Sequence, residues 1–141
     1  NGGGMFVSVG PNGDNGLSGK KLVVDAYGPT VPIGGGAWSG KDLHKVDRLG
    51  GLLARQLAKR IVRVGLAGEA LVFLEYLPGG DSPAQVLVRL DGNSESIAFE
   101  KLLNGICLDN ETVWSNFNEC EIPLDKLACW GHHYYNLPWE R

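Results

Sequence analysis

A glycine-rich stretch followed by lysines and an acid lies between Gly34 and Arg48, where the chain reads GGGAWSGKDLHKVDR. Glycines directly before a helix start leave backbone N–H groups free to point at an anion. The segment matches the first part of the nucleotide P-loop, but Asp42 stands where that pattern requires a Ser or Thr hydroxyl for magnesium. It therefore predicts a phosphate-binding loop unlike that of ordinary P-loop enzymes. A plain glycine-rich turn is the alternative.

A second glycine-rich segment of the same kind lies upstream, at Gly10 to Lys21, and reads GPNGDNGLSGKK. Together the two segments supply Lys20, Lys21, Lys41 and Lys45 in a chain whose net charge is −3. Positive charge is thus concentrated locally in a chain that is not basic overall. This pattern favours one polyanionic ligand and gives no support to nucleic-acid binding.

The elements that must position these loops follow from apolar spacing. The sequence predicts strands at Met5–Val9 and Leu22–Tyr27, and a helix from about Lys45 to Val64 that Gly65 stops. If that helix began as early as Lys41, then Lys41, Lys45 and Arg48 would share one line of its surface. Asp47 would project from the opposite flank of the apolar stripe, so a site shared with Lys45 would need residues from elsewhere.

The second half predicts a hairpin and further helices. Runs at Ala70–Tyr76 and Gln85–Leu90, joined by PGGDSP, indicate two paired strands. Amphipathic patterns predict short helices at Ser94–Gly105 and Asp109–Asn118, and the aromatic tail at Trp130–Trp139 fits an interface or a core equally well. We therefore expect an α+β domain whose mixed or antiparallel sheet carries helices on one face.

Composition indicates a single domain over residues 1–141, with residues 1–5 expected to be disordered or a remnant of a preceding segment. No apolar run reaches membrane-span length. Three cysteines without a C-x-x-C motif argue against a disulfide framework and for a reducing, cytoplasmic location. Cys129, His132 and His133 lack the paired spacing of a zinc site, so packed or surface residues are the better interpretation.

The two glycine-rich segments, together with the closing segment GHHYYNLPWE, resemble one family. They are similar to the carboxy-terminal third of S-adenosylmethionine synthetase (methionine adenosyltransferase), over about Phe6 to Glu140. The resemblance implies one of three similar sheet-and-helix domains, in an enzyme of dimers or tetramers that pack sheet on sheet. It also implies formation of S-adenosylmethionine from ATP and L-methionine, with release of phosphate and diphosphate and with Mg²⁺ and K⁺ as cofactors.

The resemblance assigns a role to each matching residue. Lys41, Lys21 and Asp14 become the candidate catalytic residues. The implied contacts are Phe6 on adenine, Asp14 on ATP and methionine, Lys20, Lys21 and Lys41 on phosphates, Ala37 in the loop meeting the nucleotide, Lys45 on the methionine carboxylate and Asp47 on magnesium.

This chain departs from the family pattern at several positions. Lys20 stands where the family has Arg, Ile33 replaces a His, Pro78 an Ile, and Leu49-Gly50-Gly51 a Ser-Ala-Ala run. The family's His-Pro-Asp, Asp-Gln-Gly and Lys-x-Gln motifs have no counterpart here. We therefore expect the chain alone to be inactive and to need a partner chain or preceding segment. A non-catalytic or regulatory subunit is the alternative.

Overall fold

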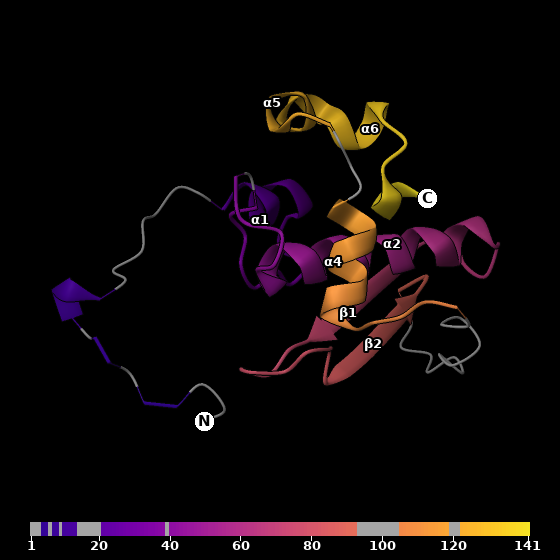
Figure 1. Ribbon diagram of the computed structural model, residues 1–141. Coiled ribbons are helices and arrows are strands. Elements are labelled where there is room, and N and C mark those ends of the chain that lie inside the picture. Colours follow the sequence, from indigo (N-terminus) through magenta and orange to yellow (C-terminus); the bar gives the residue numbers. More distant parts are fainter. Residues whose placement is uncertain are drawn as a thin grey trace.

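A long helix crossing a short hairpin forms the centre of the molecule (Figure 1). The structure, a computed structural model, describes residues 4–5, 7–8, 10–13, 21–38, 40–92, 105–118 and 122–141. The helix is α2 (Val46–Arg63), and the hairpin consists of β1 (Ala70–Glu75) and β2 (Gln85–Leu90). Helices and an antiparallel pair of strands therefore make the α+β architecture that the sequence predicted.

The hairpin has one covered and one open face. The strands pair antiparallel, with Val72 opposite Val88 and Phe73 opposite Leu87. Because side chains alternate along a strand, Val72 and Val88 share the face that packs on the core. Phe73 and Leu87 share the other face, where Leu87 is 52% exposed. The helices thus cover one face of the sheet, as expected.

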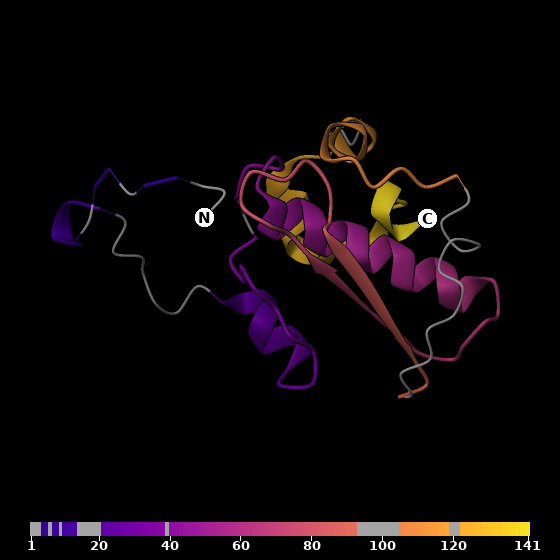
Figure 2. The same ribbon diagram turned by 90° about the horizontal axis from the view of Figure 1, so that it is seen from below.

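The core forms where the apolar stripe of α2 meets the covered face of the hairpin and helix α4 (Asn110–Asn118). The side chain of Asp109 starts α4 by accepting hydrogen bonds from the backbone N–H (3.0 Å) and hydroxyl (3.1 Å) of Thr112. Figure 2 shows α4 on one side of α2 and α1 (Leu22–Tyr27) on the other. The buried core residues are Leu49, Leu52, Leu53, Leu57, Ile61, Val72, Leu90, Val113, Phe117, Leu127, Leu137 and Trp139.

The aromatic tail divides between core and surface. The remaining short elements are η1 (Gly10–Asn12), α5 (Leu124–Lys126), η2 (Leu127–Gly131), α6 (His132–Tyr134) and η3 (Pro138–Glu140). Trp139 in η3 is 2% exposed, whereas Trp130 and Tyr134 are exposed. The last residues of the tail, Leu137 and Trp139, therefore belong to the core, whereas Trp130 and Tyr134 belong to the surface.

The strand predicted at Leu22–Tyr27 is wrong, because this segment is helix α1. The amide of Asp25 bonds to the carbonyl of Lys21 (3.0 Å), and Gly28, at φ 70°, closes the last turn on Val24 (2.9 Å). Leu22 is 65% exposed, so the apolar run is not a buried strand. Local β propensity is overridden here by the fold and by the glycine that ends the helix.

Two other predicted elements are only partly described. Within the predicted Met5–Val9 strand, Met5, Val7 and Ser8 lie outside any strand, and Phe6 and Val9 are outside the described residues. The predicted helix at Ser94–Gly105 lies outside them as well, apart from Gly105. In the part of the chain that the structure covers, no helix has the length and apolarity needed to span a bilayer.

Candidate functional site

The glycine loop at residues 34–38 is held against the first turns of α2 by Trp38. The indole N–H of Trp38 donates to the carbonyl of Gly35 (2.7 Å). Its ring rests on Gly51, where a Cβ atom would overlap the ring carbons. Two interactions of the Trp38 side chain therefore fix the loop. The indole N–H bonds to the loop, and the other end of the ring packs on α2.

Lys41 and Asp47 meet beside this loop. The ammonium of Lys41 bonds to the carboxylate of Asp47 at 2.9 Å, with side chains 24% and 44% exposed. Asp47 also packs on the backbone of Gly35, where a Cβ would overlap its carboxyl group. A cation, an acid and a glycine backbone therefore share one partly open position, which is an arrangement able to bind an anion or a hard cation.

The backbone around Lys41 is tied down on both sides. Its amide bonds to the carbonyl of Trp38 (3.0 Å), and its carbonyl accepts a hydrogen bond from the guanidinium of Arg48. Burial lowers the pKa of Arg48, against the attraction of Asp42. Asp42 in turn accepts the backbone N–H of His44 (2.9 Å), which holds the pKa of its carboxyl below the usual value. The turn that presents Lys41 is thus built from hydrogen bonds within the segment.

The end of the first glycine-rich segment reaches the second. The amide of Val23 bonds to the carbonyl of Gly36 (3.4 Å), and a Cβ on Gly36 would clash with Val24 and lie 3.5 Å from the Cα of Lys21. Lys21, which precedes α1, is exposed beside this contact. Residues 14–20 of that segment are outside the described residues.

The other predicted site residues are placed as follows. Ala37 is half-buried in the loop, and Lys45 is exposed at the start of α2. Phe6, Asp14 and Lys20 lie outside the described residues. The roles carried over from the resemblance stay predictions for all of them.

The predicted line of Lys41, Lys45 and Arg48 along one helix does not form, because α2 begins only at Val46. Lys41 is in the preceding turn and is connected to Arg48 through its carbonyl. Asp47, which helical spacing separates from Lys45, instead meets Lys41. The segment before the helix folds back, and this brings together residues that a continuous helix would have kept apart.

Sequence reasoning missed Trp38 as a residue that positions the loop. The sequence feature that could have indicated this role is the pair of glycines inside α2, Gly50 and Gly51. They stand where the S-adenosylmethionine synthetase pattern of the sequence analysis has alanines. Gly51 makes room for the ring of Trp38, and Gly50 makes room for the ring of Tyr76. Helix-weakening residues in a helix centre indicate a close approach by another group.

Metal-binding side chains do not cluster in the described part of the chain, where no three His, Cys, Asp or Glu residues come together. His132 accepts the indole N–H of Trp139 on its Nδ1 (2.9 Å), and Cys129 is an exposed free thiol.

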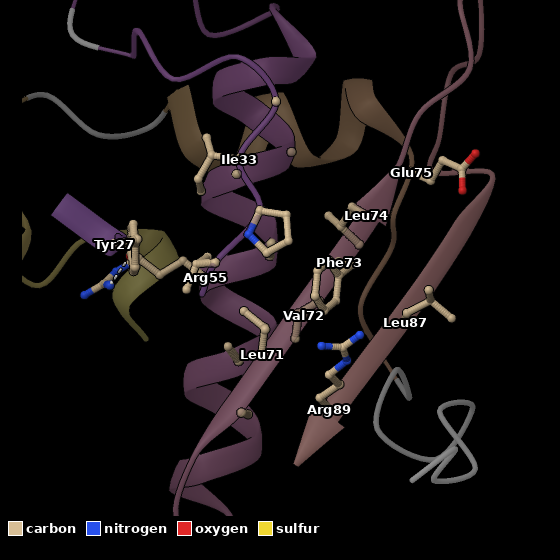
Figure 3. A pocket seen from close by; sticks show the side chains of 18 of the residues that line it. Tyr27, Ile33, Arg55, Leu71, Val72, Phe73, Leu74, Glu75, Leu87 and Arg89 are labelled. Carbon is tan, nitrogen blue, oxygen red and sulfur yellow. Dashed lines mark hydrogen bonds between the residues drawn. The ribbon is translucent and has the colours of Figure 1, made fainter. Parts of the chain in front are cut away.

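A long groove extends from the glycine loop along the hairpin (Figure 3). Gly35, Trp38 and Asp47 line one end, and β1 lines its length. Near the loop end the hydroxyl of Tyr76 is buried without a hydrogen-bond partner among the described residues, and burial raises the pKa of Tyr76 to about 12. The groove is open to solvent and has a volume of about 1280 Å³.

Comparison with known proteins gives one consistent family. Residues 8–141 match the model of the S-adenosylmethionine synthetase C-terminal domain. The S-adenosylmethionine synthase of Prochlorococcus marinus subsp. pastoris is 40% identical, over 98% of this chain and 37% of that protein. That of Deinococcus radiodurans is 50% identical over 70% of this chain and 24% of that protein.

The fold agrees with these sequence matches. The structure of an unusual S-adenosylmethionine synthetase from Campylobacter jejuni matches 86% of this chain and 34% of its own, with a TM-score of 0.69 and 34% identity. The chain spans little more than a third of the length of such relatives. It belongs to the S-adenosylmethionine synthetase family, in the part that corresponds to the carboxy-terminal domain.

Proposed function

We propose that this chain works as the carboxy-terminal part of an S-adenosylmethionine synthase. The assembled enzyme forms S-adenosylmethionine from ATP and L-methionine and hydrolyses the released triphosphate to phosphate and diphosphate. The family match over residues 8–141 supports the assignment. Because the chain spans 37% of a full relative, the remaining catalytic groups come from a preceding segment or a partner chain, and the chain alone does not turn over.

The chemistry requires cations more than a base. The methionine sulfur is a neutral thioether and attacks C5′ of ATP without losing a proton. The leaving triphosphate carries several negative charges, so fixed positive groups near its oxygens lower the barrier. Lys41 and Lys21 supply such groups from the two glycine-rich segments.

The observation that carries the proposal is the meeting of Gly35, Lys41 and Asp47 at one partly open position. Gly36 packs against α1, so Lys21 lies next to the same loop. A polyphosphate there would find a backbone it can approach closely and two ammonium groups. Loop glycines without side chains make that approach possible.

Mg²⁺ fits this position with Asp47 as its protein ligand, because Mg²⁺ is commonly held by one or two carboxylates together with phosphates and water. When bound, it neutralises charge on the phosphates. Asp47 would then hold the ion beside the glycine loop, and Lys41, released from Asp47, would face the phosphates. K⁺ is proposed from the resemblance alone and has no assigned ligand.

The remaining roles also rest on the resemblance. We assign Phe6 to adenine stacking, Asp14 to ATP and methionine, and Lys20 to the phosphates. Ala37 contributes loop backbone and Lys45 binds the methionine carboxylate. The enzyme is proposed to be cytoplasmic and to act as a homodimer or tetramer.

The test is methionine-dependent ATP consumption by the assembled synthase carrying Lys41→Ala. Loss of one fixed charge that stabilises a leaving polyanion is expected to lower kcat by about 10²-fold or more. Lys126→Ala, at an exposed lysine of α5 that does not line the groove, is the matched control and is expected to keep full turnover. Unchanged turnover of Lys41→Ala would instead favour a non-catalytic subunit.

A further inference from the structure

Two rings outside the groove join the turn before α2 to helix α4. The imidazole of His44 stacks on the indole of Trp114, with ring centroids 4.3 Å apart and ring planes 24° from parallel. Neither residue lines the groove. Stacked rings of this kind attract each other beyond the effect of the apolar area that they bury. The stack is therefore a contact between two separate elements, and no step of the proposed chemistry uses it.

His44 lies in a turn whose hydrogen bonds are local. In residues 42–45, the amide of Lys45 donates to the carbonyl of Asp42 (3.1 Å), and the amide of His44 donates to the carboxylate of Asp42 (2.9 Å). The imidazole Nδ1 of His44 lies 3.3 Å from the same carboxylate oxygen. These bonds give the turn its shape but do not connect it to another element. Leu43, which packs against the core, and His44, which stacks on α4, make that connection.

Helix α4 gives the stack a firm support. Val113 and Phe117, on either side of Trp114 in the sequence, are 3% and 2% exposed in the core. The amide of Asn110 donates to the carbonyl of Asp81 in the turn of the hairpin (2.8 Å). Trp114 itself is partly buried against the core. Because the core and the hairpin both hold α4, a ring that stacks on Trp114 is positioned by the body of the fold.

Lys41 lies directly before this turn, and Lys45 lies at its end. Lys41 is proposed to bind phosphates and Lys45 the methionine carboxylate, so one turn sets the separation of the two ammonium groups. If the turn is loose, part of the binding energy of each ligand goes into ordering it. The apparent affinity then falls in proportion to the fraction of molecules in the competent arrangement. A turn that His44 already holds in place avoids that loss.

We infer that His44, stacked on Trp114, is a positioning residue that orders this turn before the substrates bind. It acts on two ligands of different chemistry, the polyphosphate of ATP and the carboxylate of L-methionine, through the lysines that flank it. It contacts neither ligand. The inference rests on the proposed function, because it takes Lys41 and Lys45 as the groups that bind these ligands.

The test is His44→Ala in the assembled synthase, with calorimetric titration of tripolyphosphate and of L-methionine, each alone and with Mg²⁺ present. Loss of one aromatic stack shifts such an equilibrium by roughly twofold to tenfold, so both affinities are expected to fall by about threefold. Saturating tripolyphosphate should then bring the methionine affinity of the variant back to the wild-type value measured under the same condition. The reason is that the first ligand orders the turn for the second.

Two further variants show whether the stacked ring is the group that matters. His44→Phe keeps a flat ring over the indole of Trp114 and is expected to restore both affinities. His133→Ala is the matched control, because His133 is an exposed histidine beside Trp130, with ring centroids 5.8 Å apart, and does not line the groove. It is expected to leave both affinities unchanged. Thermal melts check that all three variants fold.

Four other results would overturn the inference. Unchanged affinities in His44→Ala mean that the stack only stabilises the fold, whatever the melting temperature. Loss of affinity for one ligand alone means that His44 contacts that ligand directly. Failure of His44→Phe to restore affinity means that the imidazole itself is required, and a methionine affinity that stays low under saturating tripolyphosphate means that the turn is not what the ligands share.

These four results leave the proposed function standing, because Lys41→Ala tests it separately. A wild-type assembly that binds neither ligand contradicts the proposed function and this inference together.

Discussion

Lys41 and Asp47, the side chains proposed to bind phosphate and magnesium, form an ion pair with each other. A phosphate that binds Lys41 must compete with the carboxylate of Asp47, which lies 2.9 Å from the ammonium. A magnesium ion that binds Asp47 must compete with the ammonium. When both bind, the magnesium ion takes the place of Lys41 beside Asp47, and the phosphate takes the place of Asp47 beside Lys41. Binding of either ligand is therefore expected to increase the affinity for the other.

Asp47→Asn is therefore expected to have opposite effects with and without magnesium. Without Mg²⁺ the variant frees Lys41 and raises the affinity of the assembled synthase for tripolyphosphate severalfold. With Mg²⁺ it loses the metal ligand and lowers that affinity by about tenfold or more, in the range found when metal ligation is disturbed. Calorimetric titration measures both, and Asp125→Asn in α5 is the control. The same sign of effect under both conditions would contradict Asp47 as the metal ligand.

Tyr76 is a second residue with an individual signature. Its hydroxyl is buried without a partner among the described residues, and burial raises its pKa to about 12. Because this folded-state pKa lies above the ordinary value of 10.0, ionising the hydroxyl costs more in the folded chain than in the unfolded chain. The folded chain is therefore destabilised as the pH rises from 10 to about 12. Ultraviolet titration of the isolated chain should show one of its four tyrosines ionising near 12.

Tyr76→Phe should remove that late ionisation. Since an unpaired buried hydroxyl costs about 1–3 kcal/mol, the variant is expected to raise the free energy of unfolding by about 1 kcal/mol, as measured by urea denaturation. Tyr134→Phe, at an exposed tyrosine, serves as control. It should leave the ionisation near pH 12 and the free energy of unfolding unchanged. A clearly destabilised Tyr76→Phe would show that the hydroxyl has a partner.

At the scale of elements, the glycine loop and α2 are joined by one ring. Trp38 bonds to Gly35 and packs on Gly51, so the loop is held by the helix that also carries Asp47. The glycines of the helix weaken it by about 1 kcal/mol each relative to alanine. The weakness is explained by the rings of Trp38 and Tyr76 that occupy the vacant space.

Gly51→Ala brings two opposing effects. Improved helix propensity contributes about 1 kcal/mol, whereas overlap with the indole costs typically about 1–3 kcal/mol. Because the hydrogen bond to Gly35 holds the ring, we expect the overlap to dominate and the free energy of unfolding to fall by about 1 kcal/mol. In a double-mutant cycle with denaturant melts, Trp38→Phe should recover most of this loss. Additive effects of the two substitutions would contradict direct contact.

At the scale of the whole molecule, Glu140 fastens the end of the chain to α2. It is 4% exposed, and its carboxylate accepts hydrogen bonds from Arg55 and Lys59. Arg55 also donates to the hydroxyl of Tyr27 at the end of α1 (2.9 Å). Burial alone would raise the pKa of Glu140, but the hydrogen bonds from Arg55 and Lys59 outweigh it and lower the pKa. The chain end, α1 and α2 thus meet in one ionic cluster.

Glu140→Gln is expected to destabilise the chain by about 2 kcal/mol, because it leaves two cations without their charged partner, although both retain some access to water. Since the pKa of Glu140 is lowered in the folded state, its contribution is complete above the usual value of 4.5 and is lost as the pH falls below it. The difference in melting temperature between wild type and variant should therefore shrink below pH 4.5. Glu111→Gln, exposed in α4, is the control, and a pH-independent difference would contradict the ion pairs.

His132 provides a separate acid response. Burial lowers its pKa, against the attraction of Glu140, and its Nδ1 accepts the indole N–H of Trp139. Because burial favours the neutral imidazole, the folded state binds a proton on His132 less readily than the unfolded state does. The free energy of unfolding therefore decreases as the pH falls below 6.5, the ordinary pKa of histidine. The two acid effects therefore begin at different pH values.

The family, the class of fold and the elements with strong periodicity follow from the amino-acid sequence alone. The stripe of leucines in α2 and the two runs joined by PGGDSP each bury one face, so their spacing alone predicts them. The glycine and lysine content of residues 34–48 predicts an anion-binding loop, and this stays a prediction. These features are local, because they follow from the period of a helix or strand and from the freedom of glycine.

Tertiary structure alone decided how the loop is arranged. Leu22–Tyr27 became a helix although its residues favour a strand, and Lys41 met Asp47 because the chain folds back before α2. Trp38 and Gly51 are 13 positions apart, yet they fit as ring and hollow. Such contacts depend on the shape of groups brought together from separate segments, and the periodicity of a single segment carries no information about them.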